Sequence, residues 1–351
     1  MEINEERLNN LLGKMVTEMG AAVSGLLVIV GDKLGLYKEL AAGQPLTSEG
    51  LAERTGTTER LVREWLAAQA SSGYIEYNQD NQTFSLTPEQ QMVFAVEDSP
   101  VFLVGGFLGL ESIYANEPKI TEAFRTGDGV SWGDHSSCLF CGTERFFRSG
   151  YRANLVPQWL PQLDGVVDKL QQGVKIADIG CGHGASTLAM AAAFPQSQFY
   201  GFDFHPPSIE IARGRAQEEG LSNVSFEVAT AKAYPGSGYD FVAFFDCLHD
   251  IGDPVGALQH VRETLTADGT LMLVEPFAND TLTENLNPVG RVFYAMSTAV
   301  CIPNSLSQEV GLALGAQAGE SRLRDVVTQG GFSQFRRATE TPFNLILEAK
   351  L

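Results

Sequence analysis

The stretch ADIGCGHGA, residues 177–185, decides the fold of this chain. It follows the apolar segment KIADI and precedes a segment of helical character near 185–194. Glycines between a strand and a helix let the backbone turn tightly and approach a ligand closely. Free N–H groups at the start of the helix also favour an anionic group. The stretch therefore predicts a ligand-binding loop at the end of a β-strand.

An acid ends the next apolar segment, in GFDF, residues 201–204. A carboxylate at Asp203 can accept hydrogen bonds from both hydroxyls of a ribose. Together with the spacing Gly180-x-Gly182-x-x-Ala185, it fits a degenerate dinucleotide fingerprint, which is typical of nicotinamide oxidoreductases. A structural turn without a ligand is the plainest alternative.

A second pattern in the same loop, Asp178-x-Gly180-x-Gly182-x-Gly184, resembles the first motif of class I S-adenosylmethionine-dependent methyltransferases. That family uses an acid on the strand near the amino-acid end of the cofactor, and Asp178 stands at this place. The resemblance implies methyl transfer with S-adenosylmethionine as cofactor. We favour this interpretation over the oxidoreductase.

Strand-like and helical segments alternate from Lys175 onward, which predicts an α/β fold with a mostly parallel sheet wrapped by helices. After a helix over 320–329, the segments Phe332–Arg336 and Phe343–Ala349 have only a short link, which predicts a hairpin with an antiparallel last strand. The resemblance implies a Rossmann-like methyltransferase domain over 151–351, with seven strands and a reversed last strand. Residues 99–150 are then a linker with helices that cover the active site.

The N-terminal part has another pattern. Helices are predicted over about 20–42, Ser48–Thr55 and about 57–71, and two short strands follow around the polar turn Asn78–Gln82. This order resembles a winged helix-turn-helix domain, which we place at 1–98.

Charge argues against a nucleic-acid partner, because phosphate backbones are bound by cationic faces. The chain has a formal net charge of −19. The helix over 57–71 offers Arg60 and Arg63, which Glu59 and Glu64 offset. We therefore predict a packing or dimerisation module and a homodimer. DNA binding by this helix is the alternative, and for the whole chain the alternative is a regulator that senses S-adenosylmethionine without turnover.

The methyltransferase resemblance assigns cofactor-binding positions, namely Asp178, Gly180, Gly182, Gly184, Asp203, Phe204, Thr230 and Asp246. The glycines would pass beneath the cofactor, Asp203 would hold the ribose, and Phe204 would flank the adenine. Many relatives present an acid to the adenine amino group where this chain has ATAK, so Thr230 or a backbone group would take that place. Asp246 falls near the methionine part of the cofactor, or it only caps a strand end.

The segment CLHDIGD, residues 247–253, resembles small-molecule O-methyltransferases of the plant type, which share a winged-helix dimerisation domain. Their catalytic histidine begins a His-Asp-x-x-Asp stretch, matched here from His249 onward. Two acids flank that histidine in the family, and Glu275 and Glu320 match their positions. The resemblance thus implies a catalytic group of His249, Glu275 and Glu320.

The chemistry agrees with this assignment. Methyl transfer from a sulfonium needs alignment with the acceptor, and a hydroxyl acceptor must also lose its proton. Histidine, with an unperturbed pKa of about 6.5, is the natural base near neutral pH. A carboxylate can orient its ring and stabilise the imidazolium. We predict O-methylation with His249 as base, while nitrogen, sulfur and carbon acceptors, and structural roles for these three residues, stay open.

Four aromatic residues are predicted to line the acceptor pocket. Phe147 and Tyr151 open a helix before the catalytic domain, and Phe293 and Tyr294 lie in an insertion over 287–307. Core packing is the alternative for each of them.

His135, Cys138 and Cys141 have spacings that a zinc ion accepts. No fourth ligand follows nearby, and a second Cys-x-x-Cys pair is absent from the sequence. We therefore predict an ordinary linker with buried thiols and no metal site.

The start of the chain, MEINEERLNN, lacks the basic flank and apolar run of a signal peptide. The apolar stretches Ala21–Val30 and Val101–Leu110 are shorter than the roughly 20 residues that cross a bilayer. Five cysteines in so long a chain do not form a disulfide scaffold. These features predict a cytoplasmic protein that does not bind membranes.

Overall fold

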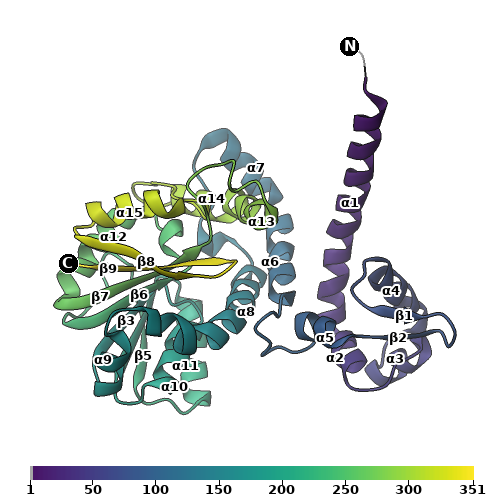
Figure 1. The fold of residues 1–351 in the computed structure, drawn as a ribbon, viewed down its shortest axis with the longest axis horizontal. Helices are drawn as coiled ribbons and strands as arrows, with labels where there is room; N and C mark the ends of the chain where they lie inside the picture. The colour runs from purple at the N-terminus through teal and green to yellow at the C-terminus, as the bar shows by residue number, and fades with distance from the viewer. Residues whose placement is uncertain (1–2) are drawn as a thin grey trace. The chain divides into compact units, whose positions relative to one another are not determined.

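The computed structural model describes residues 3–351, which form two compact units (Figure 1). The N-terminal unit holds the residues up to Glu111 together with Cys141–Ser149, and the C-terminal unit holds Ser112–Phe140 and Gly150–Leu351. The segment 99–150, predicted as one linker, is thus divided between the two units. Arg145 ties the second segment to the N-terminal unit, because its guanidinium lies 2.7 Å from Asp32 and 2.8 Å from Glu97.

The N-terminal unit has the element order of a winged helix-turn-helix domain. Thr47 caps α3 by accepting a hydrogen bond from the N–H of Gly50, and Gly56, with φ 64°, ends that helix. Thr87 and Gln90 form a capping box at the start of α5. The elements are α1 (Glu5–Lys33), α2 (Leu36–Ala41), α3 (Ser48–Thr55), α4 (Glu59–Ser71), β1 (Glu76–Asn78), β2 (Thr83–Ser85), α5 (Pro88–Phe94) and α6 (Val104–Ala115).

Helix α1 is longer than the sequence predicted. Asn4 caps its start, and Gly35, with φ 70°, separates it from α2, so the predicted single helix over 20–42 is two helices. Its large apolar side chains are exposed along much of its length: Leu8, Leu11, Leu12, Met15, Val16, Met19, Val23 and Leu26. Among residues 3–351, α1 is the one helix long and apolar enough to cross a membrane, a test that a signal sequence or a core helix also passes. The apolar stretch was predicted to be too short because the extension to Glu5 was missed.

The C-terminal unit is built on a seven-stranded sheet in the order β5-β4-β3-β6-β7-β9-β8. The pairs from β5 to β7 are parallel, and β9 runs antiparallel to both β7 and β8. The predicted α/β fold with a reversed last strand is confirmed. The strands are β3 (Lys175–Ile179), β4 (Gln198–Asp203), β5 (Val224–Val228), β6 (Tyr239–Phe245), β7 (Leu265–Pro276), β8 (Gln334–Glu340) and β9 (Asn344–Lys350).

Helices cover both faces of this sheet (Figure 1). Figure 1 shows α12 (Pro254–Thr264) and α15 (Gly319–Gln329) on one face, and α9 (Val166–Gln172), α10 (Ala185–Ala193) and α11 (Pro206–Glu218) on the other. The remaining helices of more than three residues are α7 (Glu117–Thr126), α8 (Ser137–Asn154), a π-helical turn over Leu155–Trp159, α13 (Pro288–Met296), a second π-helical turn over Ser297–Cys301, and α14 (Ile302–Leu306).

The strand order determines where a ligand can bind. The chain leaves β3 toward β4 and β5 on one side, and then continues with β6 and β7 on the other side. In such open sheets, ligands bind outside the carboxyl ends of the strands where the order reverses. The loops after β3, β4, β6 and β7 are therefore the ones that build a site.

Candidate active site

The loop after β3 is folded onto the end of β4. Gly180, Gly182 and Gly184 all have left-handed φ values, of 72°, 52° and 80°. A Cβ at Gly180 would lie 2.6 Å from the sulfur of Cys247, whereas a Cβ at Gly182 would meet no atom within 4 Å. The loop therefore packs tightly at Gly180 and faces open space at Gly182.

Asp178, on β3, presents an unsatisfied carboxylate oxygen. The side chain is fully buried, and its Oδ2 accepts hydrogen bonds of 2.6 Å from the hydroxyls of Ser186 and Thr187 at the start of α10. Its Oδ1 has no hydrogen-bond partner among the described residues. Burial raises the pKa of Asp178 to about 6. A buried carboxylate oxygen without a partner is costly, so the position suits a cationic ligand group.

Asp203, at the end of β4, connects that strand to the glycine loop. Its Oδ2 accepts a hydrogen bond from the N–H of Gly182 at 2.9 Å, and its Oδ1 accepts one from the N–H of His205 at 2.8 Å. Burial raises the pKa of Asp203, although these backbone bonds oppose the shift. The neighbouring Phe204 is half exposed, and Thr230, after β5, is exposed.

Asp246, directly after β6, is held by two side chains. Its Oδ2 accepts a 2.6 Å hydrogen bond from the hydroxyl of Tyr151, and its Oδ1 accepts a 2.8 Å bond from the amide of Asn344. The residue has a left-handed φ of 49°. Burial raises the pKa of Asp246 to about 8. Tyr151, predicted to line the acceptor pocket, thus binds Asp246, and its own side chain is buried.

His249 and Glu275 form a buried pair beyond β6 and at the end of β7. Nδ1 of His249 lies 2.6 Å from Oε2 of Glu275, and Oε1 of the same carboxylate accepts the N–H of Leu248 at 3.0 Å. On the other side of the ring, Nε2 lies 3.4 Å from Oδ1 of Asp250. Burial alone would lower the pKa of His249, but the carboxylates of Asp250 and Glu275 raise it well above its usual value.

Comparison with known proteins agrees with this geometry. Residues 170–310 match the family described as "Methyltransferase domain", and residues 21–95 match an Rv2258c-like winged HTH domain. This chain carries a methyltransferase domain. Such a domain implies S-adenosylmethionine as the methyl donor. The oxidoreductase alternative is thereby set aside.

The relatives share the domain at modest identity. The chain is 34% identical to the aklanonic acid methyltransferase DauC of Streptomyces sp. (strain C5) over 107 residues, which are 30% of this chain and 49% of that protein. It spans about half the length of the curated relatives it matches. Human N-acetylserotonin methyltransferase in complex with S-adenosylmethionine is similar in fold, with a TM-score of 0.69 at 16% identity over 99% of this chain and 98% of that one. The mitomycin 7-O-methyltransferase MmcR is also similar, with a TM-score of 0.68 at 18% identity over 99% and 100% of the two chains.

In the C-terminal unit, the carboxylate of Glu320, which was predicted to flank the histidine, is held by two arginines. Its two carboxylate oxygens bind Arg324 and Arg337, each at 2.7 Å. The carboxylate near Nε2 of His249 is instead that of Asp250. The partners of Glu320 in the described structure are thus two arginines, one at i+4 on α15 and one on β8.

The other residues predicted for the acceptor pocket lie in different surroundings. Phe293, on α13, is buried with Cys301 and Ala316, and Tyr294 beside it is partly exposed. Phe147 belongs to the N-terminal unit, where its ring lies 5.0 Å from that of Phe146.

His135, Cys138 and Cys141, whose spacing a zinc ion would accept, are not among the groups of metal-ligating side chains found in residues 3–351. Nδ1 of His135 lies 2.6 Å from the side-chain amide of Asn116. The group of metal-ligating side chains that the described structure does bring together is His249, Asp250 and Cys301. The sequence analysis missed Cys301, because it lies about 50 residues from His249 and no motif links the two.

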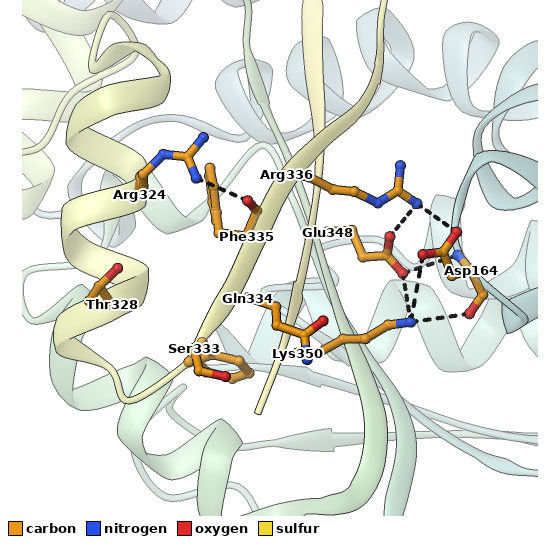
Figure 2. Close-up of a pocket in the computed structure, with 10 residues that line it drawn as sticks. Asp164, Arg324, Thr328, Ser333, Gln334, Phe335, Arg336, Glu348 and Lys350 are labelled. Atoms are coloured by element: carbon orange, nitrogen blue, oxygen red, sulfur yellow. Dashed lines mark hydrogen bonds and ion pairs between the residues drawn. The ribbon is translucent and has the colours of Figure 1, made fainter.

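A hollow of about 540 Å³ lies elsewhere in the C-terminal unit (Figure 2). Figure 2 shows that the charges of Arg336, Lys350, Glu348 and Asp164 pair with one another there. Lys350 follows Ala349, which forms the first pair between β9 and β7 with Leu271, so the hollow lies toward the amino ends of the parallel strands. The glycine loop follows the carboxyl end of β3, and the hollow and the loop therefore lie at opposite ends of the strands.

Proposed function

We propose that this protein transfers the methyl group of S-adenosylmethionine to a hydroxyl oxygen of a small molecule, with His249 as general base. The observation that carries the proposal is the buried 2.6 Å hydrogen bond between Nδ1 of His249 and Glu275. An ionised carboxylate only accepts hydrogen bonds, so Nδ1 carries a proton, and Nε2 is the nitrogen that accepts one once the ring is neutral. The raised pKa of His249 means that this neutral form is reached at a pH above the usual range for histidine. The ring is thus oriented for proton removal.

The residues at the ends of β3 and β4 fit the cofactor. The unpartnered Oδ1 of Asp178 suits the ammonium of its methionine part. Asp203 keeps lone pairs for the ribose hydroxyls, although one backbone N–H already binds each of its oxygens. The open space at Gly182 lets a ligand approach the backbone. When bound, the cofactor supplies a sulfonium methyl group that a nucleophile can displace.

The residues that follow β6 and the one near the end of β7 have different roles toward the acceptor. His249 takes the hydroxyl proton at Nε2, a contribution of roughly 10²–10⁴-fold to the rate. Glu275 holds the ring in orientation through Nδ1. Asp250, 3.4 Å from Nε2, stabilises the imidazolium that forms. Asp246, fixed by Tyr151 and Asn344, faces the methionine part of the cofactor in this proposal.

We assign a homodimer to the N-terminal unit and no nucleic-acid partner. The exposed apolar stripe of α1 is a surface that a second copy would cover. On α4, Arg60 pairs with Glu64 at 2.6 Å and Arg63 pairs with Glu59 at 2.8 Å, which leaves little positive charge for phosphates. None of the five cysteines forms a disulfide bond in the described structure, as is typical of a reducing cytoplasm.

The reaction itself is tested by an acceptor screen. The purified full chain is incubated with S-adenosylmethionine and a panel of phenols, other alcohols, amines and thiols, and the release of S-adenosylhomocysteine is measured. We expect release with hydroxyl compounds, and mass spectrometry of the product should place the new methyl group on oxygen. Release with amines or thiols alone, or binding of the cofactor without any turnover, would overturn the proposal.

A further inference from the structure

Three metal-ligating side chains meet at the open nitrogen of His249. A ring nitrogen of His249, a carboxylate oxygen of Asp250 and the sulfur of Cys301 all lie within 4.8 Å of one another. Nε2 is the nitrogen on the Asp250 side of the ring, 3.4 Å from Oδ1, because Nδ1 is bonded to Glu275. His249 and Cys301 are buried, and Oδ1 of Asp250 is a buried atom without a hydrogen-bond partner among the described residues. We propose that these three side chains bind a thiophilic divalent cation, Zn²⁺, and that the bound ion blocks methyl transfer.

The donor set is one that zinc prefers. Zn²⁺ takes imidazole nitrogen, thiolate sulfur and carboxylate oxygen at about 2.0–2.3 Å, so the ligand atoms of a tetrahedral site lie roughly 3.3–3.8 Å apart. The separation of up to 4.8 Å seen here needs only small side-chain rotations to reach that range. Three protein ligands leave the fourth position open to water. The thiolate favours zinc over magnesium or calcium, which prefer oxygen ligands.

Glu275 completes the arrangement behind the histidine. Metal-binding histidines almost always donate their other ring N–H to a carboxylate or carbonyl group, which fixes the tautomer and the ring orientation. Nδ1 of His249 already donates to Glu275 at 2.6 Å, and Nε2, on the Asp250 side of the ring, is therefore the nitrogen that is left to bind a metal after it releases its proton. The hydrogen bond to Glu275 that orients His249 as a base therefore also orients it as a metal ligand.

The segment that carries Cys301 is fixed to the histidine loop. Cys301 ends a π-helical turn, a rare element that is frequent at functional sites. In the next turns, the amides of Asn304 and Gln308 both donate to the carbonyl of Asp250, at 3.2 Å and 2.9 Å. These bonds hold the thiol and the carboxylate in one place, although the two residues lie 51 positions apart in the sequence.

Coordination exchanges protons for the ion. The Cys301 thiol releases its proton to solvent when the sulfur binds zinc, and Nε2 releases any proton that it carries. The occupied Nε2 can no longer accept a proton from an acceptor hydroxyl. Metal binding stands on the geometry alone, whereas its inhibition of methyl transfer rests on the proposed role of His249.

Binding is tested with Co²⁺, which replaces zinc and reports its ligands by absorption. The chelator-treated full chain is titrated with Co²⁺, and we expect one ion per chain with a thiolate-to-cobalt charge-transfer band. Cys301→Ser should lose the band, and the matched control Cys138→Ser, in α8, should keep it. Asp250→Asn should keep the band but weaken binding, and Glu275→Gln should weaken it by roughly 10–100-fold. A wild type without the band, or a Cys301→Ser variant that keeps it, would overturn the site; thermal melts establish that each variant is folded.

Inhibition is tested on the same proteins with Zn²⁺. We expect zinc to stop methyl transfer by the wild type and Cys138→Ser, and a chelator to restore it. Cys301→Ser, measured against its own metal-free rate, should need at least tenfold more zinc. If cobalt binds with the expected band but zinc leaves the rate unchanged, the metal site stands and the role of His249 as base fails. If zinc inhibits the wild type and Cys301→Ser equally, the inhibition comes from elsewhere and the proposed blocking is wrong.

Discussion

The two halves of the proposed site differ in how the chain builds them. The cofactor half, around Asp178 and Asp203, consists of short contiguous segments. Backbone N–H groups of the glycine loop and of residue 205 bind the carboxylate of Asp203, and hydroxyls at the start of α10 bind that of Asp178. The acceptor half, around His249, consists of side chains from residues 249, 250, 275 and 301. A half built from backbone is fixed by local sequence, whereas a half built from distant side chains depends on the whole fold. We expect substitutions in the cofactor half to change the affinity for the cofactor, and substitutions in the acceptor half to change the methyl-transfer rate.

Two matched glutamates give the sharpest contrast on the acceptor side. Glu275→Gln removes a charge-assisted hydrogen bond to His249 and should lower the methyl-transfer rate roughly 10–100-fold. Glu320→Gln should leave the rate within about twofold, because its partners are Arg324 and Arg337. Both rates are measured at saturating cofactor. Equal losses in the two variants would restore Glu320 to the catalytic group and contradict its placement here.

On the cofactor side, Asp203→Ala should act on affinity and leave the rate at saturation unchanged. The lost bonds to ribose should weaken cofactor binding by about 1–3 kcal/mol, or roughly 5–150-fold. Isothermal calorimetry with S-adenosylhomocysteine measures this loss. An unchanged dissociation constant would show that the ribose is held by other groups.

The acidity of Asp178 should appear in the pH dependence of cofactor binding. Its pKa is raised by burial to about 6, so the carboxylate is charged above this pH and neutral below it. An ammonium ligand binds the charged form, and the affinity should therefore fall roughly tenfold between pH 7 and pH 5. Asp178→Asn should bind weakly at both pH values and lose the dependence. A wild type whose affinity is flat over this range would exclude Asp178 as the ammonium partner.

Helix α1 belongs to neither half, so substitutions there should leave both the cofactor affinity and the methyl-transfer rate unaltered. Leu12→Glu with Val16→Glu places charges on the exposed apolar stripe and should convert the dimer to a monomer by light scattering. The free energy of unfolding of the isolated subunit should change by no more than about 0.5 kcal/mol, because both side chains are exposed. Asn10→Glu, on the opposite face of the same helix, is the control that keeps the dimer. A wild-type monomer, or a dimer that survives the double substitution, would remove α1 from the interface.

The same contrast explains what the sequence predicted. The glycine loop, Asp203 and the order of strands follow from local spacing, and the structure has the fold that they indicate. His249 and Glu275 follow strands whose neighbourhood in the sheet could be inferred, and they do meet.

Other features of the structure could not be predicted from local sequence. Glu320 was placed by its position before the final hairpin, but its side chain is drawn to Arg324 and Arg337. Cys301 reaches His249 only because the insertion after β7 returns to the histidine loop, and no local pattern predicts such a return. The start of α1 was missed because its apolar residues serve no core within the chain.

The most direct test of the account is a pair of readings on one preparation of His249→Ala. Calorimetry gives the dissociation constant for S-adenosylhomocysteine, and a single-turnover experiment at saturating S-adenosylmethionine gives the methyl-transfer rate. The account predicts an affinity within about twofold of the wild type and a rate lower by roughly 10²–10⁴-fold. His260→Ala, which removes a histidine bound to the carbonyl of Tyr234, should leave both readings unchanged. A His249→Ala variant that keeps the wild-type rate would contradict the account.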